Sequence, residues 1–172
     1  CAAVRIPIEV GGGIRKIADA EKLFAVGVER IILGTLAVEN PELLAEFLAK
    51  FGTEKIVVGL DAREGGLKLA TRGWESATEI DVLDFAEKLE KMGVSRIIYT
   101  DIARDGTLTF PNFDVAERLV ATTKLKVIAS GGVTDVAHCE ILRKVGCEGA
   151  ILGKAIYENK ISLAEIKNAL EK

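Results

Sequence analysis

The chain has 172 residues, of which 49% are hydrophobic and 28% are charged, a composition typical of a globular domain with a sizeable core. Its net charge of −3, from 23 Lys+Arg against 26 Asp+Glu, does not indicate the basic surface that binding to a nucleic acid backbone requires. No apolar run approaches the roughly 18 residues of a membrane-spanning helix. Neither nucleic acid nor a membrane is therefore an expected partner.

The cysteine and histidine content limits the chemistry further. Cys1, Cys139 and Cys147 form an odd set without a C-x-x-C pair, which is typical neither of a disulfide framework nor of a structural zinc site. The one histidine, His138, has acidic neighbours in a helical segment and is expected to be a surface residue. We therefore expect a cytoplasmic protein with no metal site and no Ser-His-Asp triad.

Along the chain, short apolar runs alternate with amphipathic segments of helical spacing. Six strands are predicted, at residues 6–10, 30–34, 55–60, 96–100, 126–130 and 149–152. Helices are predicted between them, at residues 18–26, 41–51, 81–92 and 113–122. This alternation is typical of βα units around a parallel sheet, so the predicted fold class is α/β.

An internal repeat is the strongest signal in the sequence, because a shift of 119 positions superimposes two sets of segments without a gap. The matched segments are Gly12-Gly13-Ile14 with Gly131-Gly132-Val133, Val26-Gly27 with Val145-Gly146, Ile32-Leu33-Gly34 with Ile151-Leu152-Gly153, and Glu39-Asn40 with Glu158-Asn159. The first predicted strand thus matches the fifth, and the second matches the sixth.

The repeat distance spans four βα units, and a fold whose symmetric half has four units has eight in all. The sequence therefore predicts a (β/α)8 TIM barrel made of two similar half-barrels. On this interpretation residues 1–172 are a single partial barrel domain that holds about the last six units. An open doubly wound sheet, complete within 172 residues, is the alternative.

Each copy of the repeat places a glycine pair after one strand and a further glycine, followed by a polar residue, after the next strand. Backbone N–H groups that lack side chains, at the start of a helix, form cradles for phosphate. The two predicted cradles are Gly12, Gly13, Gly34 and Thr35 on one side, and Gly131, Gly132, Gly153 and Lys154 on the other. They predict a ligand with phosphates at both ends, unless the glycines only terminate strands.

Two strand ends carry candidate catalytic groups. Asp61 follows the third predicted strand, at the rim where barrel active sites form, and is the leading candidate for an acid. A structural carboxylate that pairs with Arg63 or caps a helix is the alternative. The fourth strand ends in Thr100-Asp101, followed by Asp105-Gly106, which offers another hydroxyl, two carboxylates and a glycine at the same rim. Asp105-Gly106 as a plain turn is the alternative.

The longest connection, residues 61–77, has the pattern of a small hairpin over the barrel mouth. It carries Arg72 and the only tryptophan, Trp74. Long loops at this face commonly bind ligands. The indole ring could stack on a planar ring while the guanidinium meets a phosphate, or Trp74 could simply pack the hairpin onto the barrel.

Together these segments resemble one family. The motifs are Val10-Gly11-Gly12-Gly13-Ile14-Arg15, Gly59-Leu60-Asp61-Ala62-Arg63, Arg72-Gly73-Trp74, Tyr99-Thr100-Asp101-Ile102, Arg104-Asp105-Gly106-Thr107 and Ser130-Gly131-Gly132-Val133. The chain resembles the histidine-biosynthesis phosphoribosylformimino-5-aminoimidazole carboxamide ribotide isomerases over essentially its whole length. The resemblance implies an aldose-ketose isomerase, an intramolecular oxidoreductase that performs an Amadori rearrangement on a bis-phosphorylated substrate without a cofactor.

The resemblance also implies roles for individual residues. Asp61 matches the general acid and Thr100 a supporting residue, while Asp105 matches a carboxylate that some relatives use as the acid instead. Arg15 and the glycines match phosphate ligands. The general base of the family is an aspartate on the first strand, which the chain as printed does not contain, so the resemblance implies an N-terminally truncated chain with little activity of its own.

Three alternatives remain at the level of sequence. The cyclase subunit of imidazole-glycerol-phosphate synthase is similar and shares the glycine cradles, although Arg72-Gly73-Trp74 favours the isomerase. A bifunctional isomerase that also accepts the tryptophan-pathway substrate is the second. The third is a phosphate-binding fragment without turnover, which associates with itself through exposed strand edges.

Overall fold

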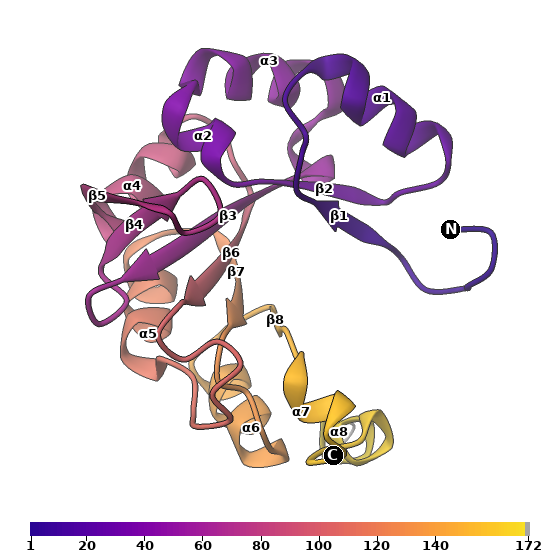
Figure 1. Cartoon of the computed structure of the whole chain (residues 1–172), viewed down its shortest axis with the longest axis vertical. Helices are drawn as coiled ribbons and strands as arrows, with labels where there is room; N and C mark the ends of the chain where they lie inside the picture. Colours follow the sequence, from indigo (N-terminus) through magenta and orange to yellow (C-terminus); the bar gives the residue numbers. More distant parts are fainter. Residues whose placement is uncertain (171–172) are drawn as a thin grey trace.

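Six parallel strands form the frame of the protein in the computed structural model, which describes residues 1–170 (Figure 1). They are β1 (Glu9–Gly11), β2 (Arg30–Leu33), β3 (Ile56–Arg63), β6 (Arg96–Asp101), β7 (Lys126–Ser130) and β8 (Gly149–Ala150). They neighbour one another in chain order, β1-β2-β3-β6-β7-β8, and each of these pairs is parallel.

This strand order decides between the two predicted architectures. A doubly wound sheet reverses its strand order at a switch point, whereas here each new strand is added on the same side of the sheet. The sheet curves into an open C with its helices outside, as in most of the circumference of a barrel (Figure 1). The α/β class and the six barrel-type βα units are confirmed, and the doubly wound alternative is wrong.

Helices cover the outer face of the curved sheet (Figure 1). They are α1 (Ile17–Ala25), α2 (Thr35–Glu39), α3 (Pro41–Phe51), α4 (Val82–Lys91), α5 (Phe113–Thr122), α6 (Val136–Lys144), α7 (Lys154–Tyr157) and α8 (Leu163–Leu170), with a 3-10 turn, η1 (Thr53–Lys55). Within residues 1–170, none of these helices has the length and apolar character that crossing a membrane requires.

Polar side chains set where several helices begin. The Asn40 side chain accepts a hydrogen bond from the backbone N–H of Leu43 at 3.0 Å, and Pro41 occupies the first turn of α3. Asp81 and Asn112 cap α4 and α5 in the same way. The predicted helix boundaries agree with the observed ones to within a residue or two.

The connection after β3 forms the predicted hairpin. Strand β4 (Lys68–Thr71) pairs antiparallel with the end of β3 and with β5 (Ser76–Asp81). The hairpin therefore continues β3 beyond the barrel wall and carries its turn, residues 72–75, over the carboxyl ends of the strands.

The two outermost strands are shorter than predicted. The first was expected at residues 6–10 but β1 begins only at Glu9, and β8 ends at Ala150 rather than at residue 152. Each of these strands has one hydrogen-bonded neighbour in the described chain, β2 and β7 respectively. A strand with a single partner has fewer backbone hydrogen bonds to hold its ends, so its pairing stops earlier.

The expectation that His138 is a surface residue is wrong. Its side chain is only 14% exposed, because α6 turns it toward α5, where its ring contacts Phe113 edge-on with centroids 5.7 Å apart. Nδ1 lies 3.3 Å from the backbone nitrogen of Thr134, which donates to it. His138 therefore joins two helices rather than facing solvent.

A charge cluster closes the amino-terminal end of the strands. Arg96, the first residue of β6, is 3% exposed and donates to both carboxylate oxygens of Glu148, just before β8, the Nη2 contact measuring 2.7 Å. It also reaches Glu54 of η1 at 3.3 Å, and Glu54 accepts from Lys126 of β7 at 3.2 Å. A buried guanidinium needs such partners, so the cluster ties together the starts of β3, β6, β7 and β8.

The same contacts affect proton binding. The hydrogen bond from Arg96 lowers the pKa of Glu148 below its ordinary value of 4.5, helped by the charges of Lys126 and Arg30. A carboxyl whose pKa is lowered by folding stabilises the folded state above its unfolded-state pKa, and this contribution is lost as the pH falls through the folded-state pKa.

We predict that Glu148→Gln lowers the free energy of unfolding at pH 7 by about 1 kcal/mol, a value below that for a fully buried pair because a third of Glu148 is exposed. The variant should also lose less stability than wild type when the pH falls below 4.5. Urea unfolding across this pH range measures both effects. Glu87→Gln, at an exposed pair with Lys91, is the matched control and should change neither quantity.

Candidate functional site

The carboxyl ends of the parallel strands form a rim that holds two pockets related by the sequence repeat. The first pocket has a volume of about 690 Å³ and the second about 50 Å³. The first contains the predicted residues Gly12, Gly13, Arg15, Gly34, Thr35 and Arg72. The second contains the predicted residues Asp105, Gly106, Gly131, Gly132, Gly153 and Lys154. The structure thus places twelve of the fifteen candidate residues in the two pockets, and it groups the eight cradle residues as the repeat predicts.

The glycine pair of the first pocket leaves its backbone accessible. Gly12 and Gly13 have φ angles of +94° and +72°, which residues with side chains rarely adopt. A Cβ atom at either position would have no atom within 4 Å. Open space therefore lies in front of this backbone, as a phosphate cradle requires.

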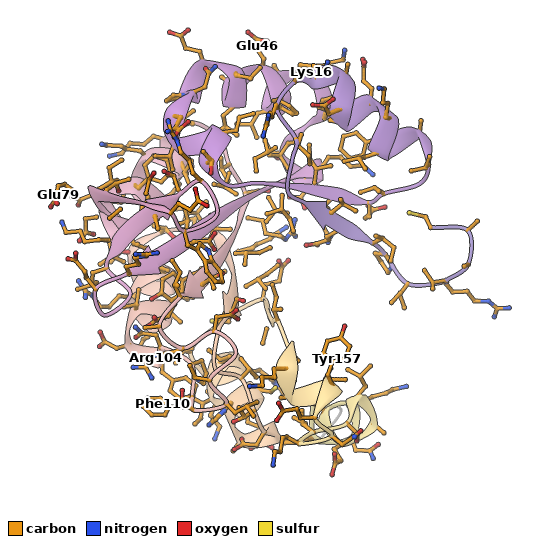
Figure 2. The ribbon with its side chains drawn as sticks, in the orientation of Figure 1. Lys16, Glu46, Glu79, Arg104, Phe110 and Tyr157 are labelled. Atoms are coloured by element: carbon orange, nitrogen blue, oxygen red, sulfur yellow. The ribbon has the colours of Figure 1, made fainter. Side chains whose placement is uncertain are left out.

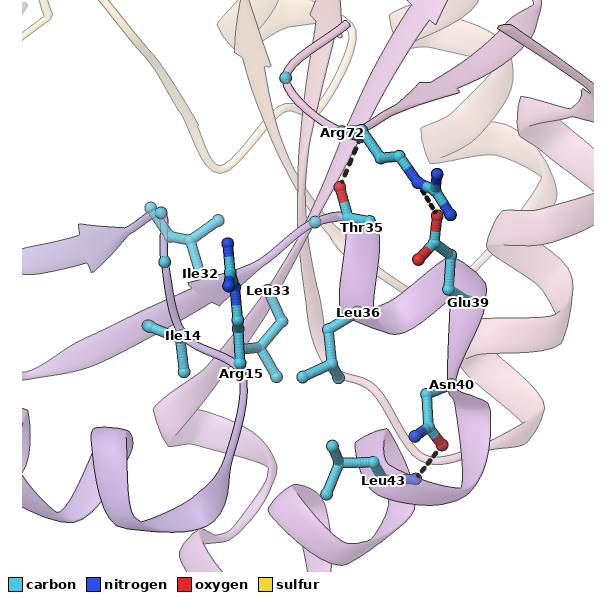
Figure 3. A pocket seen from close by; sticks show the side chains of 14 residues that line it. Ile14, Arg15, Ile32, Leu33, Thr35, Leu36, Glu39, Asn40, Leu43 and Arg72 are labelled. Carbon is cyan, nitrogen blue, oxygen red and sulfur yellow. Dashed lines mark hydrogen bonds and ion pairs between the residues drawn. The ribbon is translucent and has the colours of Figure 1, made fainter. Parts of the chain in front are cut away.

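The hairpin turn closes one side of the first pocket (Figure 3). The backbone N–H of Arg72 donates to the Thr35 hydroxyl at 2.8 Å, and Nε of Arg72 lies 2.8 Å from a carboxylate oxygen of Glu39. Arg72, Gly73 and Trp74 all have positive φ angles, so three successive left-handed residues bend the chain toward α2. The first pocket is consequently built from β1, β2, α2 and a hairpin distant in sequence.

The second pocket is narrower because the connection between β6 and α5 packs onto it. A Cβ atom at Gly131 would lie 2.7 Å from the carbonyl oxygen of Asp101, and one at Gly132 would lie 2.4 Å from that of Phe110. Leu108 of the same connection lines the pocket. Glycine is thus required here by close backbone contact as well as by its φ angle.

The three remaining candidates lie outside both pockets. Asp61 and Thr100 are neighbours in the register of β3 and β6, with Asp61 half-buried and Thr100 7% exposed. The alternative pairing of Asp61 with Arg63 does not form, since Arg63 donates to the carbonyl oxygen of Trp74 instead. Trp74 is half-buried at the hairpin turn, and its carbonyl oxygen helps to hold the turn by accepting from Arg63.

A buried polar network beside Thr100 was not predicted. Asp101 is 1% exposed and its carboxylate accepts hydrogen bonds from Asn112 at 2.8 Å and from Arg104 at 3.1 Å. Asn112 also donates to the carbonyl oxygen of Gly65 at 2.9 Å. These contacts join the connection after β3 to the connection after β6. The only available signal was the position of Asp101 at a strand end.

Tyr99 completes this network. Its hydroxyl donates to the carbonyl oxygen of Gly66 at 3.1 Å, and burial, followed by the nearby charge of Asp101, raises its pKa. The phenol therefore stays protonated and remains a donor. A Cβ atom at Gly66 would lie 2.1 Å from this hydroxyl, which explains why the loop has glycine there.

Glu39 was not predicted as a site residue either. It lines the first pocket, and its carboxylate holds Arg72. The sequence match between Glu39 and Glu158 was the signal that could have identified it. A carboxylate in a predicted anion site is unexpected from charge alone.

We predict different costs for alanine at the repeat-matched positions Gly13 and Gly132. Gly13→Ala meets no atom and should lower the free energy of unfolding by only about 1 kcal/mol through its left-handed backbone. Gly132→Ala must displace the Phe110 carbonyl as well and should cost roughly 2–3 kcal/mol. Urea denaturation of the two variants compares them, and equal costs would contradict the close packing of the second pocket.

The curved parallel sheet and the two glycine-rich rim pockets define a barrel-type α/β protein. Comparison with known proteins agrees with this class. A family model described as "Histidine biosynthesis protein" matches residues 1–162, and the chain belongs to this family. The six strands are therefore most of the wall of the family's TIM barrel.

Related proteins include several isomerases. The chain is 51% identical, over 92% of its length and 65% of the relative, to the 1-(5-phosphoribosyl)-5-((5-phosphoribosylamino)methylideneamino) imidazole-4-carboxamide isomerase of Dehalococcoides mccartyi strain 195. Proteins of the same name from Picosynechococcus sp. PCC 7002 and Bacillus anthracis are 47% and 46% identical over 98% and 96% of the chain. The chain spans about 65% of the length of the first of these relatives.

Proposed function

We propose that this chain carries most of the active site of an aldose-ketose isomerase. Its substrate would be the imidazole carboxamide ribotide named for its relatives, which has a phosphoribosyl group at each end. The observation that supports this best is the pair of repeat-related pockets at one rim, together with a strand-end carboxylate, Asp61. A small molecule with two phosphates matches the doubled pockets, and cytoplasmic localisation matches a biosynthetic step.

Phosphate binding would use backbone and cationic groups from both halves of the repeat. In the first pocket the open backbone of Gly12 and Gly13 faces the ligand, with Arg15 and Arg72 as cations. In the second pocket Lys154 supplies the charge beside Gly131 and Gly132. Charge-assisted hydrogen bonds of this kind are stronger than neutral ones and orient a phosphate firmly.

The chemistry would begin with Asp61 as a general acid. Its proton goes to the ring oxygen of the aminoaldose while the C1–O bond breaks, and the nitrogen lone pair forms a Schiff base at C1. Loss of the C2 proton to a base then gives an enolamine, which tautomerises to the aminoketose. Thr100, adjacent to Asp61 in the register, would support the carboxyl, and none of the described residues is assigned to the base.

Asp105 is the alternative acid. It lies on the exposed connection after β6 and lines the second pocket, whereas Asp61 is part of a strand. A carboxyl on a rigid strand is held in position more accurately than one on a loop. This difference favours Asp61 as the acid and a substrate contact for Asp105.

We predict that Asp61→Asn abolishes turnover of the aminoaldose, with a loss of at least about 100-fold in kcat. The assay uses the 172-residue chain mixed with the part of the Dehalococcoides mccartyi relative that precedes the aligned region. Asp105→Asn should mainly raise KM. A larger kcat loss for Asp105→Asn than for Asp61→Asn would assign the acid to Asp105, and no turnover by the wild-type mixture would contradict the isomerase.

Exposed strand edges support a second property, self-association of the 172-residue chain. β1 and β8 each have one paired neighbour, and apolar residues near them are exposed, including Ile6 at 69% and Ile151 at 41%. Tyr157 of α7 is 87% exposed and extends toward the open side of the sheet (Figure 2). Unpaired edges with adjacent apolar surface favour pairing with another chain.

We predict that the chain forms dimers at concentrations near 100 µM, a roughly typical affinity for a small edge interface. Sedimentation velocity over a dilution series measures this. Ile6→Lys places a charge beside the β1 edge and should shift the equilibrium to monomer, whereas Ile141→Lys, on the outer helix α6, should not. A monomer at all concentrations would contradict self-association.

A further inference from the structure

The two copies of the repeat share a feature that the glycines do not explain, a glutamate at matched positions. Glu39 ends α2 and Glu158 follows α7, and each carboxylate holds one cation. Glu39 lies 2.8 Å from Nε of Arg72, and Glu158 lies 3.5 Å from Nζ of Lys154. The repeat therefore preserves a carboxylate–cation pair in each copy, and the cations Arg72 and Lys154 line the two pockets.

The source of the cation differs between the copies. Lys154 lies on α7, one turn before its own glutamate. The matching position in the first copy is Thr35, which has no charge, and there the cation is Arg72 of the hairpin. Thr35 still contributes, because its hydroxyl accepts from the backbone N–H of Arg72.

The geometry therefore fixes Arg72 at two points. One holds its backbone to Thr35 and the other holds its side chain to Glu39, as Figure 3 shows. The side chains of Arg72 and Glu39 are 66% and 42% exposed, and an exposed ion pair alone adds little to stability. The ion pair instead restricts the long side chain of Arg72 before a ligand binds. This restriction lowers the entropic cost of immobilising the side chain on binding.

The negative charge of Glu39 allows two possible roles of this residue to be separated by experiment. A carboxylate that lines an anion pocket repels the ligand, so on electrostatic grounds alone removing Glu39 should strengthen phosphate binding. If Glu39 instead positions Arg72, removing Glu39 should weaken phosphate binding. The direction of the change therefore separates the two roles.

We propose that Glu39 is a positioning residue that holds Arg72 at the first pocket to bind a phosphate group, in the place that Lys154 takes at the second. This role rests on the proposed function, because it requires the first pocket to bind phosphate. Glu39 does not contact the ligand in this arrangement and acts only through the arginine.

The test is a titration of the 172-residue chain with inorganic phosphate, followed by the NMR shifts of the Gly12 and Gly13 amides. Glu39→Ala should raise the Kd of phosphate about fivefold, the effect of one well-placed ion pair. Glu39→Gln keeps an acceptor for Nε and should bind within about twofold of wild type. Glu46→Ala is the matched control, since Glu46 is exposed on the outer helix α3 (Figure 2).

A double variant tests more directly whether Glu39 acts through Arg72. In an Arg72→Ala background, Glu39→Ala should no longer weaken phosphate binding, because nothing is left to position. The amides of Gly131 and Gly132 lie in the other pocket and report whether each variant is folded. Unchanged shifts there exclude a general loss of structure.

Two results would overturn the role of Glu39. Tighter or unchanged phosphate binding by folded Glu39→Ala would make the carboxylate a repulsive or neutral neighbour. Equal weakening with and without Arg72 would mean that Glu39 does not act through the arginine. If wild type showed no phosphate shifts at Gly12 and Gly13, the phosphate pocket of the proposed function would fail, and this role with it.

Discussion

The parallel pairing of β3 with β6 is the constraint on which the site depends. The two strands align from Val58 with Ile97 to Ala62 with Asp101, and both are almost wholly buried. This register places Asp61 beside Thr100 at the rim. It also fixes the start of both long connections, one of which becomes the hairpin at the first pocket and the other the connection that narrows the second. A shift of one residue would turn Asp61 to the opposite face of the sheet.

Polar interactions hold this central pair at both ends. Below it, the buried guanidinium of Arg96 joins Glu148 and Glu54, so the starts of β3, β6 and β8 are held together by charge. Above it, the carboxylate of Asp101 joins the two rim connections through Asn112. These two clusters join neighbouring elements where the strands begin and where they end.

Patterns in the sequence were sufficient for much of this structure. Helix caps such as Asn40 and Asp81, and continuous apolar runs such as β7, are local features that single segments determine. The repeat predicted the grouping of both pockets, because equivalent segments in a barrel take equivalent places. The contacts that were missed share the opposite property. Asn112 reaches Asp101 and Gly65, and Arg72 reaches Glu39, 33 positions away in the chain. Pairings of polar side chains across the fold leave no periodicity to detect, and the ends of β1 and β8 depend on neighbours rather than on propensity.

The differences between the two copies of the repeat bear on how the site works. Both copies keep the glycine pair, which the backbone geometry requires, and the glutamate, which holds a cation. They differ in the cation itself and in what covers the pocket. The first copy has space of about 690 Å³ and takes its arginine from a hairpin, whereas the second has about 50 Å³ and carries its own lysine. In the proposed function, an unsymmetrical ligand with chemically similar ends needs its two phosphates distinguished, because only one orientation would bring the reacting ribose to Asp61. Backbone cradles of the same shape cannot make that distinction, so it must come from the parts that diverged: the hairpin, the connection after β6, and the cations that they leave in place.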